Sequence, residues 1–153
     1  MITNNLFSSL DTSASGLTAE RLRIDAIAGN IANVDTTRTP EGGPFKRQLV
    51  IFASKTDFAP RRFPFLPMKI KTKLEQPGNG VKVLEMFKDP APPRLRYEPG
   101  HPDANNEGYV AYPNIDVVKE MVDMMSAARA YEANVTAINA AKTMFSKSLE
   151  IGR

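Results

Sequence analysis

Residues 117–149 read VVKEMVDMMSAARAYEANVTAINAAKTMFSKSL, a stretch that contains neither proline nor glycine. Apolar side chains recur in it at alternating steps of three and four residues, broken only by Lys142: Val117, Met121, Met124, Ala128, Tyr131, Val135, Ile138, Phe145 and Leu149. This spacing puts them on one face of a helix, and such a face needs another helix to cover it. We therefore predict a long C-terminal helix with Asn114 as its N-cap, Asp116 in its first turn and Gly152 at its end.

The N-terminal stretch, residues 5–34, carries the same pattern and no proline. Its apolar positions, interrupted only by the polar Ser13 and Glu20, are Leu6, Leu10, Leu17, Ile24, Ile27, Ile31 and Val34. We call the apolar positions of both ends the helix seam. Segments 1–36 and 114–153 are expected to pack on each other as a coiled-coil-like pair of helices.

The middle region, residues 37–113, holds the prolines of the chain and is expected to be β-rich. Three runs alternate or concentrate strand-forming residues, namely Gln48–Phe52, Met68–Leu74 and Gly80–Phe87, and we predict a strand for each. Proline-dense segments 59–67 and 89–93 are expected to be loops. The predicted fold class is α+β, with two long terminal helices and a small, proline-rich β region between them.

The composition excludes several kinds of chemistry. Cysteine is absent, so thiol catalysis, thiolate metal sites and disulfides are excluded. The single histidine, His101, lies near Glu98, Asp103 and Glu107, but this group lacks the spacing of a metal site. A structured polar turn is the simpler interpretation of that segment, and we expect neither a metal nor a cofactor.

Two acidic pairs, Asp103 with Glu107 and Glu120 with Asp123, could in principle supply general acid and base groups. The second pair lies off the helix seam, on a face where solvated charges are expected. No serine occupies a nucleophile-elbow pattern, and the glycines at 42–43 lack the lysine of a phosphate loop. We therefore expect no catalytic residues and no enzymatic activity.

Basic residues gather in one part of the middle region, where Asp57 is the only acid: Lys46, Arg47, Lys55, Arg61, Arg62, Lys69, Lys71 and Lys73. Phenylalanines lie among them, and proteins that bind single-stranded nucleic acids combine basic residues with aromatic side chains on which bases stack. A polyanion- or nucleic-acid-binding module over residues 46–73 is therefore one alternative. A small phenylalanine core with lysines facing solvent is the simpler interpretation. No apolar run is long enough to span a membrane, and residues 1–30 lack a cleavable secretory signal.

The helix seam favours assembly of the chain with other subunits. Two long apolar seams bury too little surface in one pair to order so many residues, which favours additional helix neighbours. Small residues beside the C-terminal seam, from Ala127 to Ala141, permit close packing on more than one side. A self-contained helical adaptor, ordered as a monomer, remains a second alternative.

Residues 30–48 read NIANVDTTRTPEGGPFKRQ and resemble the N-terminal signature of the FlgC family of flagellar basal-body rod proteins. The NIAN core is shared by the wider group of rod and hook proteins, and the TTRT and GGP extensions are similar to this family. The motif positions are Asn30, Ile31, Ala32, Asn33, Thr36, Thr37, Arg38, Thr39, Gly42, Gly43 and Pro44. Segments 99–114, 117–122 and 130–134 resemble the family's entry into its last helix and that helix itself.

The resemblance implies a non-enzymatic subunit of the proximal rod, the shaft that transmits torque and encloses the export channel. It also implies partners: further copies of the chain, other rod proteins, the membrane-embedded ring and the flagellar type III export apparatus, which exports such subunits without a cleaved signal peptide. Neither nucleic acid nor a cofactor is implied. Residues 30–39 are expected to set the turn from the first helix into the outer part, with side chains bonding to local backbone. Residues 58–67 match no family motif.

Overall fold

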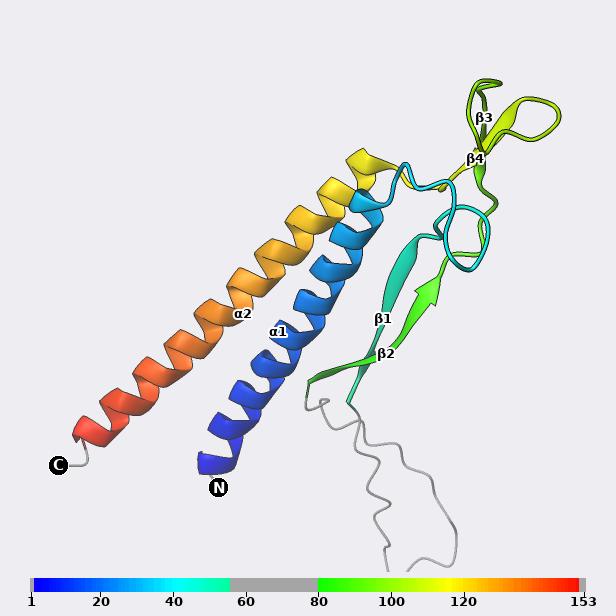
Figure 1. Ribbon diagram of the computed structural model, residues 1–153. Coiled ribbons are helices and arrows are strands. Elements are labelled where there is room, and N and C mark those ends of the chain that lie inside the picture. Colours follow the sequence, from blue (N-terminus) through cyan, green and yellow to red (C-terminus); the bar gives the residue numbers. More distant parts are fainter. Residues whose placement is uncertain (1, 56–79, 152–153) are drawn as a thin grey trace, which may run out of the picture.

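The computed structural model describes residues 2–55 and 80–151. Its elements are α1 (Ile2–Ala32), β1 (Gln48–Ser54), β2 (Val81–Lys88), β3 (Arg94–Tyr97), β4 (Tyr109–Tyr112) and α2 (Val117–Ile151). The helices run in opposite directions, so the N- and C-termini lie at the same end of the molecule (Figure 1). The predicted α+β layout, two long terminal helices around a β-containing middle, is confirmed.

Small residues let α1 and α2 approach each other closely. The buried apolar residues of this pair are Ala19, Ala26, Ile27, Ala127 and Ala141. A Cβ atom added to Gly16 would lie only 3.0 Å from Nδ2 of Asn134 on α2. Because dispersion contacts decline steeply with distance, this close approach strengthens packing along the pair.

α2 begins later than expected, and Asp116 caps it. The Asp116 Oδ1 accepts hydrogen bonds from the backbone N–H groups of Val118 (3.0 Å) and Lys119 (3.3 Å). The prediction of Asn114 as N-cap is therefore wrong. The Asn114 Oδ1 instead accepts a hydrogen bond from Nε of Arg94 at 3.0 Å, so it is already engaged elsewhere.

Replacing Asp116 with alanine is expected to lower the free energy of unfolding by about 1 kcal/mol, because two N–H groups at the start of α2 lose their acceptor. Urea denaturation followed by circular dichroism measures the change. Asn114→Ala is the matched control, with an expected change within about 0.5 kcal/mol. A larger effect from Asn114→Ala than from Asp116→Ala would contradict this assignment of the cap.

The described strands form two separate antiparallel pairs, β1 with β2 and β3 with β4. The predicted strands at Gln48–Phe52 and Gly80–Phe87 are confirmed as β1 and β2, whose register shifts between Ile51 and Phe52. The predicted strand Met68–Leu74 lies outside the described residues. β3 and β4 were not predicted.

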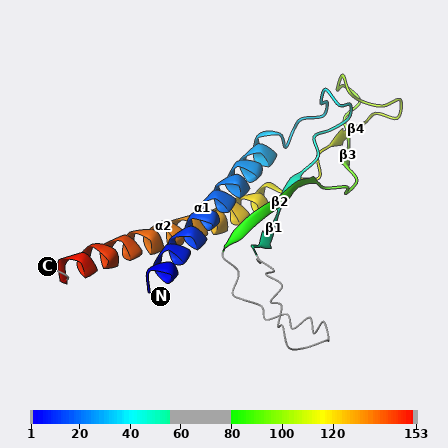
Figure 2. The same ribbon diagram turned by 90° about the horizontal axis from the view of Figure 1, so that it is seen from below.

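α1 occupies the centre of the molecule, with α2 on one side and the β1–β2 pair on the other (Figures 1 and 2). At the start of β2 the sheet is tied to α1 by Ser15, whose Oγ accepts a hydrogen bond from the Val81 N–H at 3.0 Å and donates one to the Thr12 carbonyl at 2.7 Å. The adjoining Gly80 is buried and has a φ of +111°. This contact holds the sheet directly on the helix.

Candidate functional site

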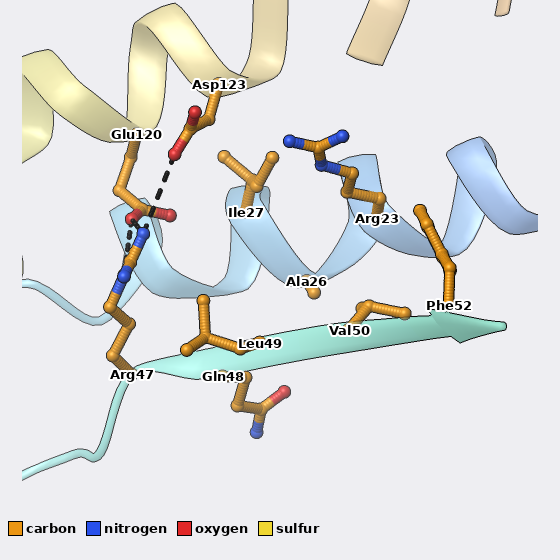
Figure 3. A pocket seen from close by; sticks show the side chains of 10 residues that line it. All are labelled: Arg23, Ala26, Ile27, Arg47, Gln48, Leu49, Val50, Phe52, Glu120 and Asp123. Atoms are coloured by element: carbon orange, nitrogen blue, oxygen red, sulfur yellow. Dashed lines mark hydrogen bonds and ion pairs between the residues drawn. The ribbon is translucent and has the colours of Figure 1, made fainter. Parts of the chain in front are cut away.

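A cluster of polar side chains joins both helices to the start of β1. We call it the polar junction, and its members are Asn30 on α1, Arg47 immediately before β1, and Glu120 and Asp123 on α2. Figure 3 shows Arg47 with the two carboxylates. Arg47 Nε donates a hydrogen bond to Glu120 Oε1 at 2.6 Å, and Arg47 Nη2 makes an ion pair with the same oxygen. The Asp123 carboxylate lies 3.6 Å from Nη2.

Asn30 connects the three segments through one side-chain amide. Its Oδ1 accepts a hydrogen bond from the Gln48 N–H (2.7 Å), while its Nδ2 donates to the Gln48 carbonyl (2.9 Å) and to Glu120 Oε2 (3.0 Å). Asn30 is 1% exposed. An aspartate or leucine of similar size could not supply both a donor and an acceptor there, which explains in physical terms why an asparagine suits this position.

The structure overturns the expectation that Glu120 faces solvent. Glu120 is 1% exposed, and its carboxylate is fully enclosed by Arg47 and Asn30. Asp123 partly faces solvent, as expected, since its side chain is 34% exposed. Sequence reasoning missed the Arg47–Glu120 pair because its members lie 73 positions apart. One available signal was the seven-residue spacing of Glu120 and Ala127, which puts both on the helix face that packs against α1.

A hollow of about 300 Å³ lies beside the polar junction. Apolar side chains of α1 and β1, among them Ile27, Leu49 and Phe52, line about half of it, while Arg23, Arg47, Glu120 and Asp123 supply its charges (Figure 3). The Arg23 guanidinium lies 3.9 Å from the Glu20 carboxylate. Both carboxylates that line the hollow, Glu120 and Asp123, are engaged by Arg47, so they do not form an acid and base pair arranged for proton transfer.

Motif residues 33–43 form the turn that leaves α1. Asn33 Nδ2 donates to the Gly29 carbonyl, and Thr39 Oγ1 donates to the Gly43 carbonyl, so these two side chains bond to local backbone. Thr37 differs, since its hydroxyl donates to Asp103 Oδ2 at 2.8 Å, across 66 positions of the chain. The turn is thus held both by local hydrogen bonds from side chain to backbone and by a hydrogen bond to the loop that precedes β4.

The loop between β3 and β4 holds the single histidine in a polar turn. His101 Nδ1 accepts a hydrogen bond from the Asp103 N–H at 3.1 Å. Beside it, the Tyr112 hydroxyl donates to Glu98, and this hydrogen bond raises the pKa of Tyr112. Among the described residues no three metal-ligating side chains gather. The hydrogen bonds of His101 and Tyr112 give the segment a structural role.

Charged pairs also hold the outer turns together. Lys88 Nζ donates hydrogen bonds to both carboxylate oxygens of Glu41, at 3.0 and 2.7 Å. This hydrogen bonding lowers the pKa of Glu41 below its ordinary value, and the charge of Lys88 adds to the effect. Both side chains are exposed, so the pair contributes little to stability.

The helix seam is covered to different degrees along its length. Ile27 is buried, and the half-buried positions are Leu10, Leu17, Ile24, Ile31, Val34, Met124, Ala128, Val135 and Ile138. The exposed positions all lie on α2: Val117, Met121, Tyr131, Phe145 and Leu149. The side chain of Leu6 lies outside the described part of the structure. In the single chain, α1 therefore leaves part of the α2 seam uncovered.

None of the helices in the described ranges has the length and apolar character needed to cross a membrane.

Comparisons with known proteins agree at both ends of the chain. The family model for flagella basal body rod protein matches residues 10–38, and the model for the flagellar basal body rod FlgEFG protein C-terminal matches residues 106–151. The first match covers the first part of the motif, and the second covers β4 and α2.

Relatives match nearly the whole chain. The flagellar basal-body rod protein FlgC of Borreliella burgdorferi is 49% identical over 95% of this chain and 97% of the relative. Its counterpart in Bacillus subtilis is 46% identical over 96% of this chain and 98% of the relative. That of Salmonella typhimurium is 38% identical over 97% and 98%. The chain therefore belongs to the FlgC family of flagellar basal-body rod proteins, structural subunits that are not enzymes.

Proposed function

We propose that this chain polymerises through its terminal helices in the proximal rod, with the helices lining the inner tube around the export channel and the β-containing region outside. Its partners include other components of the flagellar rod. The proposed set is completed by further copies of the chain, the membrane-embedded ring and the type III export apparatus. The export apparatus delivers the chain without a cleaved signal peptide. These specific partners rest on membership of the family.

The uncovered part of the α2 seam carries the proposal. Phe145 and Leu149 are 43% and 60% exposed, and the neighbouring Met144 is 62% exposed. Three large apolar side chains within two turns of a helix are costly to leave in water, at roughly 1.5 to 3 kcal/mol for each that could be buried. Neighbouring helices in a polymer would bury them, so assembly has a clear driving force at this end of the molecule.

The polar junction suits a subunit that carries load. It connects α1, α2 and the start of β1 through hydrogen bonds of 2.6 to 3.0 Å, of which the Asn30–Glu120 bond is buried and the other three are partly buried. Charged hydrogen bonds in a buried site are short, directional and stronger than exposed ones. A twist applied to the outer region would therefore pass into the helix pair through these bonds rather than bend a flexible connection.

Replacing Phe145 with aspartate is expected to abolish incorporation into the rod and swimming, because a neighbouring helix would have to bury an unpaired charge. The isolated chain should keep its fold, since Phe145 is already exposed. Motility in soft agar and immunoblots of isolated basal bodies measure the effect. Circular dichroism of the purified variant verifies the fold.

Thr143→Asp is the matched control. It adds the same charge at an exposed position two residues earlier, which faces about 160° away from Phe145 around the helix. This variant should enter the rod and swim. Normal swimming by the Phe145→Asp variant would count against the exposed α2 seam as an assembly surface.

The polyanion-binding alternative is not favoured. Arg47 belongs to the basic segment 46–73, yet its guanidinium is engaged by Glu120 and Asp123 and its side chain keeps only 15% exposure. Positions 56–73 of that segment lie outside the described residues. The FlgC relatives are named as rod proteins throughout. The self-contained adaptor is disfavoured for the same reason.

A further inference from the structure

The loop between β3 and β4 contains a tight turn that the side chain of the single histidine closes. His101 Nδ1 accepts a hydrogen bond from the backbone N–H of Asp103, two residues further on, at 3.1 Å. A backbone N–H can only donate, so Nδ1 carries no proton and the ring proton lies on Nε2. The hydrogen bond therefore requires the neutral form of His101, in one particular tautomer.

The same hydrogen-bonding pattern occurs at three other places in the described residues, and there an aspartate or an asparagine supplies the acceptor. Oδ1 atoms of Asp89, Asn105 and Asp116 accept from N–H groups two residues further on, at 2.9 to 3.0 Å. Amide oxygens do not titrate near neutral pH, and aspartates titrate well below it. Histidine changes its charge between about pH 5 and pH 8. Position 101 thus has the type of acceptor that mild acid removes.

Protonation of the ring changes both its hydrogen bonding and its charge. An imidazolium has two N–H donors and no acceptor, so Nδ1–H and the Asp103 N–H would face each other as two donors, and the ring would have to turn away. The charged and titratable groups around this turn come from the loop, the hairpin and the turn after α1: Asp103, Glu98, Arg96, Tyr112, Asp35 and Arg38.

Asp103 connects the histidine turn to the turn that leaves α1. Its Oδ2 accepts a hydrogen bond from the Thr37 hydroxyl at 2.8 Å, and its Oδ1 lies 3.9 Å from the Arg38 guanidinium. His101 positions the backbone of Asp103 through the Nδ1 bond, while its own ring meets the Tyr112 ring edge to face with centroids 6.4 Å apart. An imidazolium would also attract the carboxylate that now binds Thr37.

We infer that His101 is a pH-sensitive lock between the β3–β4 hairpin and the turn after α1. The neutral ring closes its own turn and holds Asp103 on Thr37, whereas the protonated ring releases both bonds. The connection is complete above the pH at which the ring titrates and is lost as the pH falls through that value. The lock acts on the outer region alone, since neither the polar junction nor the Ser15–Val81 bond includes a histidine. It goes beyond the proposed function and does not depend on it.

Nuclear magnetic resonance of the purified, ¹⁵N-labelled full chain between pH 8 and pH 5 tests the lock. At pH 8, long-range ¹H–¹⁵N spectra should show the His101 ring proton on Nε2. As the pH falls, we expect the amide resonances of Asp103 and Thr37 to shift with the same midpoint as the His101 ring. The protection of the Asp103 amide against hydrogen exchange should fall several-fold over the same range, because the amide loses its acceptor.

His101→Asn is the matched variant. Its Oδ1 can accept from the Asp103 N–H as Asn105 does for Glu107, and it does not titrate. We expect the Asp103 amide of this variant to stay protected down to pH 5. Thr37→Val is a second variant, which removes the hydroxyl donor at similar side-chain volume. In it the Asp103 amide should still follow the His101 ring, while the amide at position 37 should no longer do so.

Three results would overturn the inference. One is a His101 ring that stays neutral down to pH 5, and another is a ring that titrates without any shift of the Asp103 amide. The third is an equal loss of protection in the His101→Asn variant, which would assign the change to a carboxylate. An unchanged shift at position 37 in Thr37→Val would show that the Thr37–Asp103 bond does not transmit the change. Each of these results comes from the single chain, so the proposed function stands in every case.

Discussion

Replacing Glu120 with alanine is expected to lower the free energy of unfolding by about 3 kcal/mol, because it removes the nearest carboxylate from the largely buried Arg47 and one of the two acceptors of the Asn30 Nδ2 group. This value is at the lower end of the range for broken buried ion pairs. Arg47 keeps 15% exposure, and Asp123 remains 3.6 Å away as a substitute partner. Urea denaturation of the purified chain, followed by circular dichroism, measures the loss.

Asp123→Ala is the matched control for Glu120→Ala. It also removes a carboxylate from Arg47 within the first two turns of α2, but the Asp123 side chain is 34% exposed and its ion pair is longer. We expect a loss below about 1 kcal/mol, as for exposed pairs. Equal losses in the two variants would show that burial of Glu120 contributes nothing particular to the junction.

Replacing Gly80 with alanine is expected to cost about 2 to 3 kcal/mol. The φ of +111° at Gly80 is one that residues with a Cβ atom rarely adopt. The added Cβ would also collide with Ser15 Oγ and lie 3.3 Å from the Thr12 Cα. Moving Ser15 aside would break its hydrogen bond to the Val81 N–H, which ties the sheet to α1. Thermal unfolding of the purified variant measures the loss.

Gly100→Ala provides the comparison, since nothing lies within 4 Å of the Cβ position at Gly100 and its φ is not positive. Its expected change is within about 0.5 kcal/mol, or slightly stabilising through the unfolded chain. If Gly80→Ala were as stable as Gly100→Ala, then the close approach of β2 to α1 would not be maintained in solution.

The local patterns of the sequence predicted the elements whose periodicity is sustained. The three-and-four spacing of the seam specified α1 and α2, because a helix face follows from neighbours one turn apart. Alternation around Val81 and Val83 specified β2 in the same way. The ends were less well predicted: α1 ends at Ala32, two residues before Val34, and α2 starts at Val117 because Asp116 is the cap.

Features that depend on distant parts of the chain could not be predicted. β3 is only four residues long and follows Pro92 and Pro93, so its alternation of arginine with Leu95 and Tyr97 is too short to specify a strand, and pairing with β4 decides it. The burial of Glu120 depends on Arg47, far away in sequence. A charge on a helix gives no local sign that a distant guanidinium will enclose it. The family motif identified Asn30 as important, but its two partners became evident only from the fold.

Together these features describe a subunit with a stiff joint and open apolar surfaces. The polar junction and the Ser15–Val81 bond fix the outer region on the helix pair within one chain. The exposed residues of α2 leave the surface that neighbours would cover. Under the proposed function, stability within the chain and association between chains thus depend on different residues. Their variants should separate in the same way, with Glu120→Ala affecting unfolding and Phe145→Asp affecting assembly.

Limited chymotrypsin digestion tests the account most directly, applied to the dilute purified chain and to isolated basal bodies under the same conditions. Chymotrypsin cuts after large apolar residues, and the last turns of α2 expose Phe145 and Leu149 in the single chain. We predict rapid cleavage at these residues in the free chain and strong protection in basal bodies, with fragments identified by mass spectrometry. Equal cleavage in both samples would contradict the claim that neighbouring helices cover the exposed seam of α2 in the rod.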